Sequence, residues 1–217
     1  MRQTGLSGKV IAGANEMHVV CLDLEGVLVP EIWIEFSRST GIEELKITTR
    51  DEPDYDKLMK YRIEILNRKN LKLKDIQEVI GKMDPLPGAK KFMETLRSET
   101  QVIILSDTFT QFAQPLMKKL DYPTLFCNEL KIAADGSVTG YELRQCDGKK
   151  KAVEALKTIN LKVMAAGDSY NDLGMIKTAN TGALFCAPES IKKQNSDIPA
   201  YETYNELLGH VRKFIKS

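Results

Sequence analysis

The sequence predicts an α/β protein built on a doubly wound parallel sheet, with a helical insertion after the first strand. Three short apolar runs, at 18–26, 101–108 and 162–172, each end in polar residues. Continuous apolarity of this kind is typical of strands that are buried on both faces of a parallel sheet. Helical patterns separate the runs, and residues 30–85 carry helical patterns only. We interpret that insertion as a cap over the carboxyl ends of the strands, where such folds bind their ligands.

The remaining elements follow from the same periodicities. Residues 124–132 and 138–145 are expected to pair as a β-hairpin, because Ala134-Asp135-Gly136-Ser137 between them has turn chemistry. A further strand is expected at 181–188. Helices are expected at 30–40, 54–69 and 73–83 in the insertion, and at 88–99, 110–121, 149–159, 171–180, 189–195 and 204–217 elsewhere.

The domain organisation follows from where these patterns change. We expect residues 17–29 and 86–217 to form the core and residues 30–85 to form the cap, with Asp-Pro-Leu-Pro-Gly at 84–88 marking the return to the core. Residues 1–16 lack the apolar centre of a signal peptide. We interpret them as a flexible leader or a remnant of an expression vector, with the fold starting near Met17.

Composition limits the class of partner. The 217 residues carry 31 basic and 30 acidic side chains, for a net charge of +1, which argues against nucleic-acid or membrane-surface binding by bulk electrostatics. No apolar run approaches the ~18 residues of a membrane helix. The four cysteines are dispersed and only two histidines are present, so neither a disulfide framework nor a zinc site is expected. These features favour the cytoplasm and a small-molecule partner; the sequence leaves a homodimer open.

Acidic residues gather at the ends of the predicted strands. Asp23 and Glu25 stand two residues apart and therefore point the same way in an extended segment, where their like charges repel. If the three strands are parallel and adjacent, their polar ends meet at one edge of the sheet. Oxygen ligands without His or Cys favour Mg²⁺, which also offsets the repulsion. The residues expected at this edge are Asp23, Glu25, Ser106, Asp107, Asp168 and Asp172.

Carboxylates beside Mg²⁺ indicate phosphate chemistry. An aspartate held on the metal can attack phosphorus, and a second carboxyl can protonate the leaving oxygen and later deprotonate water. Asp23 and Glu25 have the residue types and spacing for nucleophile and acid/base. Glu25 must be protonated when the leaving group departs, so we expect its pKa to be raised by burial or by like charge. An Asp-x-Glu-Gly sequence in isolation is commonly an exposed turn.

Four motifs in order resemble a known family. They are Asp-Leu-Glu-Gly-Val at 23–27, Ser106 after an apolar strand, a lysine in Asp-Gly-Lys-Lys-Lys at 147–151, and Gly-Asp-Ser-Tyr-Asn-Asp at 167–172. From about residue 17 to its end, the chain resembles the haloacid dehalogenase superfamily of phosphohydrolases, and its insertion resembles the cap of the phosphoserine phosphatase branch. The runs at 23–33, 48–56 and 105–109 look closest to bacterial phosphoserine phosphatases with homoserine phosphotransferase activity.

The resemblance implies a role for each motif residue. Asp23 is the nucleophile and Glu25 the acid/base, and Mg²⁺ is held by the Asp23 carboxylate, the Glu25 backbone carbonyl and Asp168. Ser106, the backbone at Asp107 and Lys149 hold the phosphoryl group, with Lys150 as the alternative lysine. Asn171 lies beside the substrate phosphate, and Asp172 supports the metal and lysine or simply caps a helix. The sequence departs from the family pattern at Glu25, where Asp is usual, and at Ser169, where Gly is usual.

The cap helix suggests what the substrate looks like. At about 100° per residue, the apolar face of helix 54–69 includes Arg62, and a guanidinium on such a face favours a carboxylate partner. Glu31, at the first turn of the cap, could face a substrate ammonium. Together they would bind an amino acid, and the resemblance assigns them these roles. The alternatives are a structural ion pair for Arg62 and a helix-dipole interaction for Glu31.

These observations predict Mg²⁺-dependent hydrolysis of a small phosphomonoester, with O-phosphoserine as the expected substrate and an aspartyl phosphate on Asp23. Two alternatives remain. One is a phosphotransferase that passes the phosphoryl group from phosphoserine to homoserine. The other is a non-catalytic phosphate- or Mg²⁺-binding signalling module, which would lack both the cap and the acid two residues after the aspartate.

Overall fold

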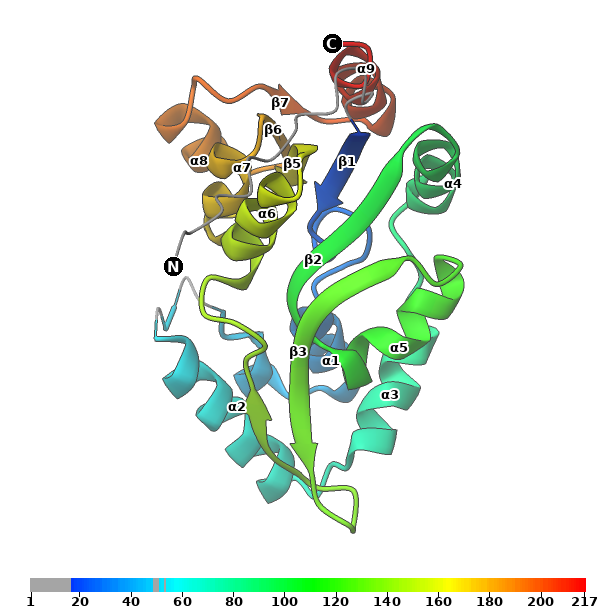
Figure 1. Cartoon of the computed structure of the whole chain (residues 1–217). Coiled ribbons are helices and arrows are strands. Elements are labelled where there is room, and N and C mark those ends of the chain that lie inside the picture. Colours follow the sequence, from blue (N-terminus) through cyan, green and yellow to red (C-terminus); the bar gives the residue numbers. More distant parts are fainter. Residues whose placement is uncertain (1–16, 49–50, 53) are drawn as a thin grey trace, which may run out of the picture.

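The computed structural model describes residues 17–48, 51–52 and 54–217, and residues 1–16, interpreted above as a leader, lie outside this part. Within it, seven strands form one sheet in the order β4-β3-β2-β1-β5-β6-β7 (Figure 1). All neighbours in the sheet are parallel except β3 and β4. The strands are β1 (Met17–Leu22), β2 (Gln101–Phe109), β3 (Thr124–Ile132), β4 (Val138–Glu142), β5 (Leu161–Gly167), β6 (Thr181–Phe185) and β7 (Ala200–Tyr201). The predicted parallel α/β fold is confirmed.

The three strands that end in polar motifs are adjacent, as the sequence predicts. Leu22 at the end of β1 pairs with Ile104 of β2 on one side and with Ala166 of β5 on the other. All side chains from Val19 to Leu22 are fully buried, which explains why the run is continuously apolar. The backbone N–H of Asp23 donates to the carbonyl of Ala166 at 3.0 Å, so the pairing extends to the first residue of the site.

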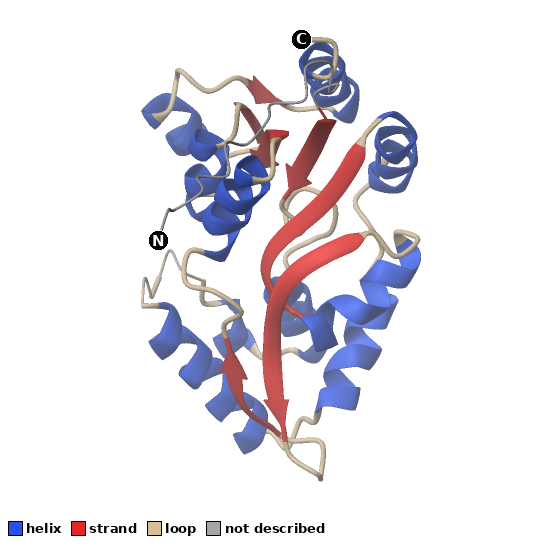
Figure 2. Ribbon diagram, in the orientation of Figure 1, coloured by secondary structure: helices blue, strands red, loops and turns tan. Residues whose placement is uncertain are grey.

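Helices cover both faces of the sheet (Figure 2). Val20 and Leu22 enter one apolar cluster, whereas Val19 and Cys21 enter the other, as the alternation of a strand requires. Among the described residues, no helix combines the length and apolarity of a bilayer-spanning segment. The core helices are α4 (Ala89–Glu99), α5 (Thr110–Lys119), α6 (Gly148–Thr158), η2 (Tyr170–Asp172), α7 (Leu173–Thr178), α8 (Glu189–Gln194) and α9 (Tyr204–Phe214).

The insertion after β1 is helical. It comprises α1 (Ile32–Thr40), the 3₁₀ turn η1 (Glu43–Lys46), α2 (Tyr55–Arg68) and α3 (Leu73–Lys82). The first helix begins at Ile32 instead of at Pro30, because Glu31 takes the N-cap position and the Ile32 N–H donates to the Glu25 carboxylate. Gly41, with φ of 68°, ends it as expected. The insertion therefore starts directly after the loop that carries Glu25.

The β3–β4 hairpin forms one edge of the sheet, and β4 runs alongside α2 (Figure 1). Asn67 Nδ2 on α2 donates to the carbonyl of Val138 at 3.1 Å, and Tyr141 Oη on β4 donates to Asp56 Oδ1 at 2.8 Å. The cap helices and the hairpin also share one continuous apolar cluster with the core. This contact was not predicted, since the hairpin lies far from the insertion in the sequence.

Candidate active site

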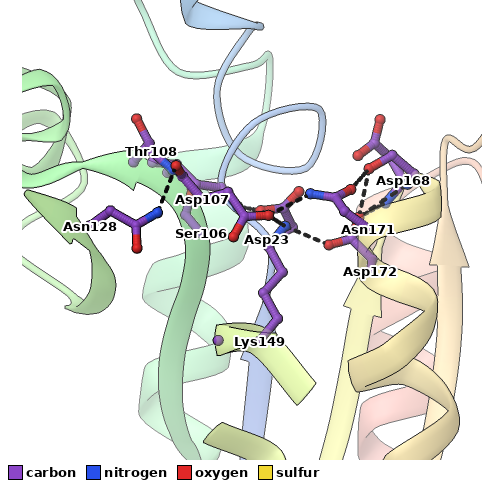
Figure 3. A network of polar contacts seen from close by, with 12 residues as sticks. Asp23, Ser106, Asp107, Thr108, Asn128, Lys149, Asp168, Asn171 and Asp172 are labelled. Carbon is purple, nitrogen blue, oxygen red and sulfur yellow. Dashed lines mark hydrogen bonds and ion pairs between the residues drawn. The ribbon is translucent and has the colours of Figure 1, made fainter. Parts of the chain in front are cut away.

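The polar ends of the three central strands meet at one edge of the sheet (Figure 3). Asp23 follows β1, Asp168 follows β5, and Ser106 and Asp107 lie near the end of β2. Carboxylate oxygens of Asp23, Asp168 and Asp172 lie within 4.8 Å of one another. The convergence expected from the strand pattern is therefore present.

Lys149 lies between the acidic residues. Its Nζ is 2.8 Å from Oδ1 of Asp23 and 2.7 Å from Oδ1 of Asp172, and the side chain is only 5% exposed. Burial acts to lower the pKa of Lys149, but the nearby carboxylates of Asp172, Asp23 and Asp107 raise it well above its usual value. Lys149 is therefore held as a cation next to Asp23.

The neighbouring Lys150 points elsewhere. Its side chain is half exposed, and its Nζ lies 3.7 Å from Glu154 on the same helix, at the i, i+4 spacing of a surface pair. Of the two lysines that the sequence left as candidates, Lys149 is therefore the one that lies beside Asp23. Helical geometry explains the difference, because consecutive residues point about 100° apart.

Asp172 orients the site and caps η2 at the same time. Its Oδ2 accepts hydrogen bonds from the backbone N–H groups of Asp168 and Ser169, at 3.1 and 3.0 Å, while its Oδ1 is engaged by Lys149. Gly167 is required beneath it, since a Cβ there would lie 2.3 Å from the Asp172 Cγ. Asp172 also stands at the N-cap position of α7 but makes no side-chain cap hydrogen bond there, so the alternative of a cap for the helix that follows is wrong. Its support of a metal stays a prediction.

The acidic cluster has the donor set for a divalent cation. Burial and the Asp172 carboxylate raise the pKa of Asp23, and burial, Asp172 and Glu31 raise that of Asp168 to about 7. Elevated pKa values in neighbouring carboxyls reflect like charges held together in a poorly solvated place. Lys149 balances only one of them. Since opposite ligands of Mg²⁺ are roughly 4.2 Å apart, oxygens within 4.8 Å need to move only slightly to share an ion.

The end of β2 carries the hydroxyl of Ser106, which also accepts a hydrogen bond from the local backbone. Ser106 is 7% exposed, and its Oγ accepts from the Thr108 N–H at 3.2 Å. The Asp107 carboxylate accepts from Asn171 Nδ2 at 2.8 Å, which joins the β2 end to η2 (Figure 3). Ser106, Asp107 and Asn171 therefore belong to one connected group with the acidic cluster.

Asn128 is a member of this network that sequence reasoning missed. It is buried on β3, where its Nδ2 donates to the Asp107 carbonyl at 3.0 Å and its Oδ1 accepts from the Arg144 N–H at 3.1 Å. It thus joins the β2 end to the segment that leads into α6 and Lys149. The available signal was an amide directly after the apolar run Leu125-Phe126-Cys127.

Glu25 lies between the end of β1 and the helical insertion. Its Oε2 accepts a hydrogen bond from the backbone N–H of Ile32 at 2.8 Å. Burial, followed by the charge of Glu31, raises the pKa of Glu25 to about 8, against the opposing effect of that backbone hydrogen bond and of Arg62. The predicted rise in pKa is confirmed, and it leaves the carboxyl able to carry a proton near neutral pH.

Arg62 lies on the buried face of α2, as its position in the apolar arc predicts. It is 7% exposed, and its Nη2 donates to the Ile47 carbonyl at 2.7 Å. Its buried Nε has no hydrogen-bond partner among the described residues. Burial lowers the pKa of Arg62 to about 10, opposed mainly by Glu25. The guanidinium therefore has an unused buried donor, which is unusual in a native fold.

The expected site residues fall into two adjoining groups. One is the network around the acidic cluster, formed by Asp23, Ser106, Asp107, Lys149, Asp168, Asn171 and Asp172. The other involves the helical insertion and comprises Glu25, Glu31 and Arg62. Glu31 is exposed and influences the charge of both Glu25 and Asp168, so the two groups are electrostatically connected.

Known proteins resemble this chain over most of its length. It is 53% identical over 201 residues to the phosphoserine phosphatase ThrH of Pseudomonas aeruginosa, covering 93% of this chain and 97% of that protein. It is 50% identical over 205 residues to a phosphoserine phosphatase of Pseudomonas syringae pv. tomato, covering 94% and 85% respectively. A crystal structure of a phosphoserine phosphatase in apo form matches with a TM-score of 0.73 and 25% identity, over 89% of this chain and 98% of that one.

The family model that matches is that of haloacid dehalogenase-like hydrolases, and it spans residues 17–180. That range runs from the first residue of β1 to the residue before β6, so it contains every site residue described above. The chain belongs to the haloacid dehalogenase-like hydrolase family.

Proposed function

We propose that the protein hydrolyses O-phosphoserine to serine and phosphate through an aspartyl phosphate on Asp23. The observation that carries the proposal is the placement of Asp23, buried at the end of β1, with Lys149 at 2.8 Å and two further carboxylates beside it. The names of the relatives, which are phosphoserine phosphatases, support the choice of substrate.

The proposed cofactor is Mg²⁺. The Asp23 and Asp168 carboxylates and the Glu25 backbone carbonyl would hold it, while both oxygens of Asp172 are already engaged by Lys149 and by backbone donors. When bound, the ion neutralises charge on the phosphoryl oxygens and on the attacking carboxylate.

In the first half-reaction, an Asp23 carboxylate oxygen attacks phosphorus and the bond from phosphorus to the serine oxygen breaks. Lys149, fixed by Asp23 and Asp172, and Ser106 bind the phosphoryl oxygens as charge builds on them. Glu25 donates its proton to the departing serine oxygen, which its pKa of about 8 allows near neutral pH.

In the second half-reaction, Glu25 acts in reverse. Its carboxylate takes a proton from water as the water oxygen attacks phosphorus, and the bond between phosphorus and Asp23 breaks to regenerate the free carboxylate. Between these steps, the Ile32 N–H donates to the Glu25 carboxylate at 2.8 Å and so keeps Glu25 at the start of the cap. We propose that residues 30–85 act as the cap over a core of 17–29 and 86–217.

The amino-acid part of the substrate would lie under the cap. The unused Nε of buried Arg62 and a second N–H on its Nη2 form an edge suited to a carboxylate. Glu31, exposed at the N-cap of α1, would face the ammonium. These two groups distinguish an amino-acid phosphate from a simple phosphate ester.

A phosphotransferase reaction is the second candidate. The same aspartyl phosphate can pass its phosphoryl group to an alcohol, and Arg62 and Glu31 would bind an incoming amino-acid alcohol such as homoserine once serine leaves. A non-catalytic signalling module is disfavoured, since it has no use for Glu25, an acid with a raised pKa next to the nucleophile. A homodimer and a cytoplasmic location stay predictions of the sequence.

The test is turnover of O-phosphoserine with Mg²⁺ present, comparing the wild type with Asp23→Asn. We expect phosphate release in the wild type and none in the variant. Adding homoserine then separates the two candidates, because a transferase forms phosphohomoserine at the expense of free phosphate. Equal activity of the Asp23→Asn variant would overturn the proposed nucleophile.

A further inference from the structure

Trp33 lies directly against the guanidinium of Arg62. The Arg62 Cζ is 4.6 Å from the centroid of the indole ring, and both side chains are buried, at 7% and 9% exposure. A cation over an aromatic face is attracted to it, and the attraction is larger when both groups are shielded from water. Trp33 therefore makes a cation–π contact with the guanidinium in a place shielded from water.

The hydrogen bonds of Arg62 show which edge stays available. Nη2 donates to the Ile47 carbonyl, and within the described part of the chain Nη1 has only the weak acceptor Met59 Sδ at 3.9 Å. Nε has no partner among the described residues. Because the contact with Trp33 holds the guanidinium against the indole, it restricts where the unused Nε–H can point. A planar carboxylate that meets this edge needs no rearrangement of the arginine.

Aromatic side chains of the core hold Trp33 in place. Its ring makes an edge contact with Phe112 of α5, with ring centroids 5.3 Å apart. Phe112 makes another edge contact with Phe109, with centroids 5.7 Å apart. Phe109 is the last residue of β2, the strand that also carries Ser106. Aromatic rings thus connect the strand that binds phosphate to the arginine on α2, and they fix the separation between the two.

We infer that Trp33 is a positioning residue that sets the specificity of the site for substrates with a carboxylate a fixed distance from the phosphate. It acts through Arg62, and the inference rests on the proposed binding of the substrate carboxylate by that arginine. A packing role alone would require only apolar bulk at position 33. The cation–π contact requires an aromatic ring.

The test compares O-phosphoserine with O-phosphoethanolamine, which keeps the phosphate and the ammonium but lacks the carboxylate. The measured quantity is the ratio of kcat/KM for the two substrates. We expect Trp33→Leu to lower this ratio by about tenfold, mainly through KM for phosphoserine, and Trp33→Phe to restore most of it. Equal ratios in the wild type and Trp33→Leu would overturn the inference.

Phe36→Leu is the matched control for packing. Phe36 is a fully buried aromatic on the same helix, in edge contact with Trp33 and without a ring contact to Arg62. We expect Phe36→Leu to lower the melting temperature as Trp33→Leu does while keeping the substrate ratio. A ratio that falls equally in both variants would assign the effect to packing and overturn the inference.

Arg62→Ala separates this inference from the proposed function. We expect Arg62→Ala to lower the ratio, and Trp33→Leu to have no further effect in that background. If Arg62→Ala leaves the ratio intact, the carboxylate assignment itself fails. If Arg62→Ala lowers the ratio and Trp33→Leu alone does not, only the role of Trp33 fails.

Fluorescence provides a readout independent of turnover, because Trp33 is the single tryptophan of the 217-residue chain. We expect L-serine to change the emission of the wild-type protein, because its carboxylate approaches the guanidinium that lies over the indole ring. The change should be lost in Arg62→Ala. An emission change of equal size in the wild type and Arg62→Ala would contradict the proposed coupling.

Discussion

The carboxylate of Asp168 lies directly against the Cα of Gly26. A Cβ at position 26 would come within 2.5 Å of both Cγ and Oδ2 of Asp168, closer than real atoms approach. Gly26 also has a φ of 76°, which L side chains rarely adopt. The glycine that follows Glu25 is therefore needed both for the turn and for the position of an acidic residue on another strand.

Replacing Gly26 should impair catalysis more than folding. We expect Gly26→Ala to displace Asp168, to raise the Mg²⁺ concentration needed for half-maximal activity, and to lower kcat about a hundredfold or more. Gly41→Ala is the control, since Gly41 has a similar φ of 68° and a Cβ added there would meet no described atom within 4 Å. Both variants carry a backbone strain of about 1–2 kcal/mol. Equal activity losses would show that strain alone is responsible.

Removing the buried lysine should affect stability as well as activity. Lys149→Met leaves the carboxylates of Asp23 and Asp172 without their cation, and breaking a buried pair in this way costs about 3–5 kcal/mol. We expect a lower free energy of unfolding by urea, partly restored by Mg²⁺, and no measurable turnover. Lys150→Met changes a surface pair only and should shift stability within about 0.5 kcal/mol. Similar losses in both variants would contradict the assignment.

A divalent cation should stabilise the folded chain. Carboxylates of Asp23, Asp168 and Asp172 lie within 4.8 Å of one another, with Lys149 as their neighbouring cation. At a Mg²⁺ concentration a hundred times the dissociation constant, binding to the folded state raises the free energy of unfolding by about 2.7 kcal/mol. This corresponds to a rise in melting temperature of roughly 5–10 °C. Asp168→Asn should remove most of this shift, whereas the exposed Asp84→Asn should keep it. An unchanged shift in Asp168→Asn would argue against the metal site.

The side chain of Asn128, which sequence reasoning missed, should connect the end of β2 to the segment that leads to Lys149. Asn128→Ala deprives the Asp107 carbonyl and the Arg144 N–H of a partner, which costs about 1–3 kcal/mol. We expect a lower kcat, because the segment that leads to Lys149 loses its attachment. Asn67→Ala also removes an amide that donates to one backbone carbonyl, but near the C-terminal end of α2 and to Val138 of β4. Asn67→Ala should lower the melting temperature without lowering kcat for O-phosphoethanolamine. A fall in kcat as large as that of Asn128→Ala would contradict the role of Asn128.

The sequence was most informative where local chemistry decides structure. Apolar runs predicted the three central strands, because a strand buried on both faces must be apolar throughout. The periodicity of helix 54–69 placed Arg62 on the buried side, which the structure confirms. The helix in 30–40 ended at Gly41 as predicted, but it began two residues late, since Glu25 accepts the hydrogen bond of the Ile32 N–H.

Contacts between distant segments could not be predicted in the same way. Choosing Lys149 over Lys150 needed the direction in which α6 meets the sheet, and the contact of the β3–β4 hairpin with α2 needed the curvature of β3. Asn128 joined the network because β3 lies next to β2. None of these relations leaves a periodic signal along the chain.

The sequence by itself determined the parallel α/β fold, the strands whose ends carry the acidic residues, and the chemical type of the site. Hydrophobic periodicity and oxygen-ligand chemistry are local properties, so they can be inferred residue by residue. Only the tertiary structure decided which lysine reaches Asp23, that Gly26 makes room for Asp168, and that Trp33 covers Arg62. Those outcomes depend on distances between segments that are remote in sequence, which packing of the whole chain sets.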